Sequence, residues 1–108
     1  DGVAITTHGA TAALVVGDTL ALPVLDYEFE LPRSVDEAYN TLRPPFDETL
    51  SPRLPGGLNI GAQLYFLQTR FPKEFSRTEH ILTYPQYWIP RCMPTPPGTT
   101  YVWYYIPL

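Results

Sequence analysis

The chain has 108 residues, of which 44% are hydrophobic and 17% charged, a composition typical of a globular protein rather than a disordered one. Its net charge of −4, with no cluster of lysine or arginine, excludes binding to nucleic acid by neutralising phosphates. The single cysteine, Cys92, excludes an internal disulfide, and no apolar run reaches the roughly 18 residues of a membrane span. We therefore expect one small domain in a reducing, cytoplasmic setting, with neither nucleic acid nor a membrane as partner.

The opening stretch AITTHGATAALVV, residues 4–16, predicts a strand that is interrupted by polar residues. A glycine inside a strand marks a bulge or a close approach by a ligand or another backbone, so Gly9 makes this stretch a candidate site. Gly17 and Asp18 form a turn signal, and a second apolar run follows at 20–25. These features predict a β-hairpin over 4–26, with Asp26 at the end of its second strand.

The segment RSVDEAYNTLRPP predicts a helix over 35–42 that Pro44 ends. Ser34 and Glu37 have the spacing of a capping box at its start. Its apolar residues recur at the spacing of one helical face: Val35, Ala38, Tyr39 and Leu42. Residues 44–57, rich in proline, then predict a long loop.

The second half of the chain predicts three more helices and one strand. A helix begins at Asn59 and ends at Phe71, because apolar residues recur at helical spacing and Pro72 follows. Pro72 suits the first position of a short helix, HILTY suits a buried strand, and Pro85 suits the first position of a last helix. The tail from Cys92 to Leu108 is Pro-rich and then aromatic, with no helical period.

Few residues of the chain point to chemistry. The two histidines, His8 and His80, lack metal-ligand spacing, no serine lies in G-x-S-x-G, and no phosphate-binding loop is present. Three residues are candidates for polar contacts, and each has a plainer alternative. His8 could bind a ligand or face solvent at a bulge, and Asp26 could be an ordinary turn carboxylate. Asn59 and Gln63 could bind a polyol or form the exposed face of their helix, and we favour the exposed face for Gln63.

The order of the segments resembles the N-terminal domain of the FGGY-type carbohydrate kinases. In that family a strand with a "GI(S/D)xxxHG" break leads into a hairpin and a "P-hydrophobic-D" strand end. Later, "pKLLWLKEHxPExF" runs into "xxILxxxDYLxxRLTG", which LNIGAQLYFLQTRFPKEFSRTEHILTYPQYWIPR resembles. Phe71–Phe75 take the place of "xPExF", Gln86 replaces the Asp of "DYL", and Arg91 takes the place of its Arg. Members that act on L-sugars such as rhamnulose or fuculose look more similar than glycerol kinase.

The resemblance implies an α/β fold, part of an actin-like (ribonuclease H-like) kinase domain, over residues 1–91. It implies ATP-dependent, Mg²⁺-dependent phosphorylation of a sugar hydroxyl by the parent protein. Carried over by position, Thr7, His8 and Gly9 contact the sugar, and Asp26 and Asn59 lie near the same cleft. The D-x-G-T/S strands that hold phosphate and Mg²⁺, the catalytic Asp and the adenosine site are not in these residues.

We therefore expect a fragment, cut from something larger, that has no kinase activity of its own and binds neither ATP nor Mg²⁺ tightly. A fragment of a domain exposes apolar surface, which favours self-association. Two departures from the family are the replacement of Asp by Gln86, which puts helix capping there in doubt, and the tail over 92–108. The alternative function is a non-enzymatic binding or assembly module that uses this aromatic tail as its contact surface.

Overall fold

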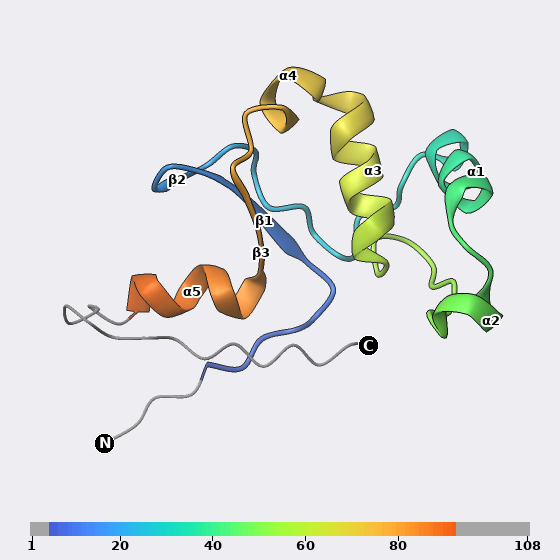
Figure 1. The fold of residues 1–108 in the computed structure, drawn as a ribbon, viewed down its shortest axis with the longest axis horizontal. Helices are drawn as coiled ribbons and strands as arrows, with labels where there is room; N and C mark the ends of the chain where they lie inside the picture. Colours follow the sequence, from blue (N-terminus) through green and yellow to red (C-terminus); the bar gives the residue numbers. More distant parts are fainter. Residues whose placement is uncertain (1–4, 93–108) are drawn as a thin grey trace.

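The computed structural model describes residues 5–92, which form a small α/β unit around a three-stranded antiparallel sheet (Figure 1). The strand order is β2-β1-β3, with β1 (Ala12–Val16) between β2 (Thr19–Leu20) and β3 (His80–Thr83). Ala12 to Val15 are all buried, which is why this apolar run takes the central position. In the β1–β3 pair Ala12 lies opposite Thr83, so two parts of the chain far apart in sequence meet at this end of the sheet.

The predicted hairpin is confirmed, but it is shorter than the sequence suggests. Gly17 adopts a φ of 54° in the turn between β1 and β2, a left-handed conformation that glycine takes without strain. The prediction of a strand is wrong over residues 5–11, because pairing begins only at Ala12, and Gly9 lies in a bend that leads into β1. The second strand also ends early, at Leu20, so Asp26 lies in a turn rather than at a strand end.

Five helices accompany the sheet within residues 5–92: α1 (Arg33–Leu42), α2 (Phe46–Thr49), α3 (Ile60–Arg70), α4 (Pro72–Phe75) and α5 (Tyr84–Cys92). The predicted helices over 35–42 and 59–71 are confirmed to within two residues, and the predicted loop over 44–57 contains the single turn of α2. None of these helices is long and apolar enough to cross a membrane.

Three expectations about helix ends differ from the structure. The N-cap of α1 is Pro32 and no side chain caps it; Glu37 instead accepts a hydrogen bond of 2.8 Å from Arg33. At α5 Gln86 does serve the start of the helix, because its Oε1 accepts a 2.8 Å bond from the Thr83 backbone N–H just before it. That helix also begins at Tyr84, one residue before Pro85.

The hydrophobic core lies between the hairpin and α3. It consists of Leu14, Leu22 and Leu67, with Ala21, Leu64, Phe66 and Phe75 packed around them. In Figure 1, α3 lies to one side of the sheet and α5 to the other, while α1 and α2 lie beyond α3. Helix α1 packs on α3 where Tyr39 meets Gly61, since a Cβ added at Gly61 would clash with the Tyr39 ring.

Candidate functional site

Two of the predicted site residues, His8 and Asp26, line one hollow of about 290 Å³. This volume is just below the range for small-molecule sites, roughly 300–1,000 Å³. The hollow is lined by His8, Thr11, Val24, Leu25, Asp26, Tyr27 and Tyr84. These side chains come from three parts of the chain: the bend before β1, the turn after the hairpin, and the start of α5.

The sheet register explains why these segments meet. Ala12 pairs with Thr83, so the preceding residue, Thr11, and the following residue, Tyr84, emerge at the same end of β1 and β3. The His8 ring lies between two aromatic rings, with its centroid 4.8 Å from Tyr27 and 5.2 Å from Tyr84. Both contacts are tilted, at 54° and 42°, a geometry within the favourable range for ring pairs. The imidazole is therefore held at the rim by contacts on two sides while His8 remains exposed.

The Asp26 carboxylate is fixed by a turn. Its Oδ1 accepts a 2.9 Å hydrogen bond from the Glu28 N–H, and its backbone carbonyl accepts one of 3.1 Å from Phe29. An Asp side chain that bonds its backbone two residues on is typical of turns. Within residues 5–92 no hydrogen bond engages Oδ2, so this exposed carboxylate keeps an acceptor for a ligand.

Thr11 is the buried polar residue of the hollow. Its exposed fraction is 2%, and its Oγ1 has no hydrogen-bond partner. A buried hydroxyl without a partner costs about 1–3 kcal/mol, so such groups are uncommon and need a reason. Nothing in the sequence distinguishes Thr11 or Tyr84 as site residues, because their proximity depends on the pairing of β1 with β3.

The other three predicted site residues do not line this hollow. Thr7 donates its hydroxyl to the His8 carbonyl at 3.0 Å, and Gly9 is exposed in the neighbouring bend. Asn59 closes a loop: its Nδ2 donates to the Pro52 carbonyl at 3.2 Å and its Oδ1 accepts from the Leu54 N–H at 2.8 Å. The Asn59 amide thus has a structural role at the start of α3.

Gln63 holds the walls of the hollow together. The prediction that it lies on an exposed helical face is wrong, because its exposed fraction is 1%. Its Nε2 donates to the Ala10 carbonyl at 2.7 Å and also to the Gly57 carbonyl. Gly57 in turn packs closely on the turn that carries Asp26, since a Cβ there would lie 3.0 Å from the Tyr27 carbonyl oxygen and 3.2 Å from that of Asp26. One amide therefore joins α3 to two of the three lining segments.

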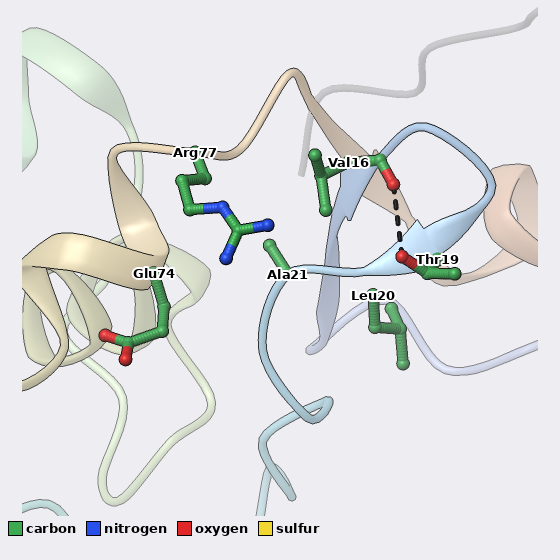
Figure 2. Close-up of a pocket in the computed structure, with 6 residues that line it drawn as sticks. All are labelled: Val16, Thr19, Leu20, Ala21, Glu74 and Arg77. Carbon is green, nitrogen blue, oxygen red and sulfur yellow. Dashed lines mark hydrogen bonds between the residues drawn. The ribbon is translucent and has the colours of Figure 1, made fainter.

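A second, smaller hollow lies beside the hairpin (Figure 2). Its volume is about 100 Å³, below the range for small-molecule sites. Figure 2 shows the Arg77 guanidinium extending toward Ala21, whereas the Glu74 carboxylate points away from Ala21. Its smaller volume makes it a weaker candidate for a ligand site than the first hollow.

The chemistry of the first hollow suits a neutral polar ligand. It offers a carboxylate, an imidazole and two phenol rings, which can form hydrogen bonds and cover apolar faces. No group of three His, Cys, Asp or Glu side chains within residues 5–92 could hold a metal ion.

Comparison with solved structures shows an informative similarity. The chain matches a segment of the crystal structure of a carbohydrate kinase from Novosphingobium aromaticivorans, with a TM-score of 0.71 and 43% sequence identity. The match covers 75% of this chain and 17% of the kinase chain. No protein-family model matches the sequence, and no curated protein does. The α/β class is confirmed, and the fold corresponds to part of a carbohydrate kinase.

Proposed function

We propose that the chain is part of the N-terminal domain of an FGGY-type carbohydrate kinase, and that its larger hollow forms one wall of the sugar site. The observation that carries the proposal is the convergence on that hollow of His8 and Asp26, two residues that the sequence alone marks as site candidates. The 43% identity to a segment of a carbohydrate kinase independently supports a carbohydrate kinase as the parent protein. Because the chain spans only 17% of that kinase, the activity of the whole protein is part of the proposal.

The substrate class follows from the hydrogen-bonding groups. Asp26 can accept from a sugar hydroxyl, and the imidazole of His8 can donate to one or accept from it. Tyr27 and Tyr84 offer ring surface for the apolar face of a sugar, in the way that binding sites combine apolar lining with a few placed polar groups. The resemblance to the L-sugar kinases makes L-rhamnulose and L-fuculose the proposed substrates. Thr7 and Gly9 contribute by shaping the bend that presents His8.

The phosphoryl-transfer machinery belongs to other parts of the proposed parent kinase. Phosphoryl transfer needs metal-held phosphates and a base positioned at the attacking hydroxyl. We assign ATP and Mg²⁺ to the rest of the parent, because the resemblance implies that the phosphate-binding strands and the catalytic Asp lie outside these residues. This chain supplies sugar binding, in the cytoplasm, and we expect no turnover from it alone.

The exposed apolar side chains between α1 and α3 support the view that the chain is part of a larger assembly. They are Leu42, Phe46, Leu50, Leu54 and Leu58, with exposed fractions from 37% to 71%. A domain cut from its neighbours exposes what those neighbours cover, and such surface promotes self-association. The alternative assembly module depends on the aromatic tail, which lies outside the described residues apart from Cys92.

The test is a titration of the isotope-labelled chain with L-rhamnulose and L-fuculose, with glycerol as the comparison ligand, followed by amide chemical shifts. We expect millimolar binding of one of the two sugars, with shifts at residues 8–11, 26–27 and 84. His8→Ala and Asp26→Asn should each weaken binding by about fivefold, the value of one hydrogen bond of about 1 kcal/mol. His80→Ala and Asp47→Asn, which remove the same groups at exposed positions away from the hollow, are the matched controls.

Equal effects of the control and the site substitutions would contradict the proposed sugar site. A coupled assay for ADP release, run with the same sugars and Mg-ATP, tests the rest of the proposal. Sugar-dependent ADP release by this chain alone would show that it is a complete kinase and not a part of one.

A further inference from the structure

The larger hollow has an apolar side that hydrogen bonds from a sugar to His8 and Asp26 do not explain. Val24 and Leu25 line it, and both residues are half-buried, so part of each remains accessible to a ligand. We propose that these two residues form an apolar subsite that selects a deoxy sugar, in which a methyl group replaces a hydroxymethyl group. This inference rests on the proposed function and deepens it, because it names the feature of the substrate that the subsite recognises.

The packing of the same segment separates these two residues from the core. Leu22 has an exposed fraction of 7% and belongs to the core cluster that contains Leu14. Within the described part of the chain, neither Val24 nor Leu25 belongs to that cluster or packs around it. The segment after the hairpin therefore divides its apolar side chains, with Leu22 in the core and Val24 and Leu25 at the hollow.

The apolar subsite lies next to the polar group that would orient the sugar. Asp26 directly follows Leu25, and consecutive Cα atoms are only about 3.8 Å apart. A sugar hydroxyl bound at the free Oδ2 of Asp26 therefore brings the neighbouring carbons of the same sugar close to the apolar subsite. The turn bond from the Glu28 N–H to Oδ1 fixes the carboxylate, and with it the position of the ligand.

The chemistry of the subsite distinguishes a methyl group from a hydroxyl. The side chains of Val24 and Leu25 offer no hydrogen-bond partner, so a hydroxyl placed against them loses water without compensation. A methyl group placed there gains from leaving water, by about fourfold in affinity. L-rhamnulose and L-fuculose both end in a methyl group, whereas their counterparts L-fructose and L-tagatose carry a hydroxyl on the same carbon.

The competing explanation is that the two residues cover the sugar without distinguishing its substituents, and variants separate the two explanations. Val24→Thr keeps the shape of the side chain and adds a hydroxyl, and Leu25→Asn introduces an amide of similar size. Val35→Thr is the matched control, because it makes the same change at a half-buried residue of α1 that lines neither hollow. Melting temperatures verify that each variant folds, and amide shifts give its dissociation constants for the two matched pairs of sugars.

We expect the unsubstituted chain to bind one of the deoxy sugars at least about fivefold more tightly than its hydroxylated counterpart. This ratio should fall at least about threefold in Val24→Thr or in Leu25→Asn and should be unchanged in Val35→Thr. The ring forms of each sugar in solution are the same for every variant, so the change in the ratio measures the contribution of the protein.

Two results would overturn the inference in different ways. If the ratio is unchanged in both subsite variants while His8→Ala weakens binding of both sugars, the apolar subsite does not select the substrate and the sugar site stands. If the unsubstituted chain binds none of the four sugars, the proposed sugar site and this inference both fail. Because the two variants alter separate residues, the test remains decisive when one of them does not fold.

Discussion

Replacing Gln63 with methionine is the most direct test of how the hollow is held together. Methionine has a similar length and is apolar, so the substitution keeps the volume of the buried side chain and removes its two donated hydrogen bonds. The Gly57 residue is buried, and leaving its carbonyl without a donor costs about 1–3 kcal/mol. Ala10 is half-buried, so water can replace part of the second bond. The expected loss of unfolding free energy is therefore about 2–4 kcal/mol.

A loss of this size is a large part of the stability of a small domain, about 5–15 kcal/mol. It should lower the melting temperature by about 10–20 °C and lower the urea midpoint in proportion. The control is Gln68→Met, the same substitution on the exposed side of α3. Amide shifts of residues 8–11 should also change in Gln63→Met and not in the control. Equal melting temperatures for the two variants would refute the assignment of Gln63 as the group that joins these segments.

The other predictions concern glycines and one arginine. Gly61→Ala should destabilise the chain by about 1–2 kcal/mol, despite the gain in helix propensity, because the new methyl group meets the Tyr39 side chain. Urea unfolding measures this change, and in a Tyr39→Ala background the same substitution should lower the unfolding free energy less, or raise it. Gly17→Ala should cost about 1 kcal/mol for a different reason, since its surroundings are open and only its φ of 54° penalises a side chain, so Gly17→Asn should cost less in the same assay. Arg91→Lys should lower the melting temperature slightly, because the guanidinium lies 3.7 Å from the Tyr87 ring centre and donates to the Asp18 carbonyl at 3.1 Å.

The elements that local signals specify are predictable from the sequence. Helical spacing of apolar residues indicates α1 and α3, and proline places the boundary between α3 and α4. The errors arise where pairing or packing decides. Residues 4–11 have a strand-like composition, but β3 offers partners only from Ala12 onward, because Thr83 is the last residue of that strand. Ser34 is a residue type that often caps helices, yet α1 already begins at Arg33, directly after its N-cap Pro32. The Glu37 carboxylate accepts a hydrogen bond from Arg33 instead of reaching back to the cap.

The site is predictable only in part, for the same physical reason. His8 and Asp26 stand out because a glycine and a turn lie beside them, and local chemistry of that kind is visible in a sequence. Tyr84 reaches the hollow through the long-range pairing of β1 with β3, and Gln63 reaches the Ala10 carbonyl across 53 residues. No local pattern around either residue specifies these contacts. The spacing of Gln63 and Asn59 on one helix is compatible with polyol binding, an interpretation that their hydrogen-bond partners in the structure do not favour.

What distinguishes a binding residue from a structural one here is whether the protein already satisfies its hydrogen bonds. The amides of Gln63 and Asn59 are engaged with backbone groups, so a ligand would have to compete with bonds that stabilise the fold. At Asp26, by contrast, the surrounding turn leaves one oxygen of an exposed carboxylate, Oδ2, free. A ligand hydroxyl can meet such a group without displacing a hydrogen bond of the folded chain. An accessible polar group that the protein leaves without a partner is therefore a better marker of the proposed sugar site than polar composition alone.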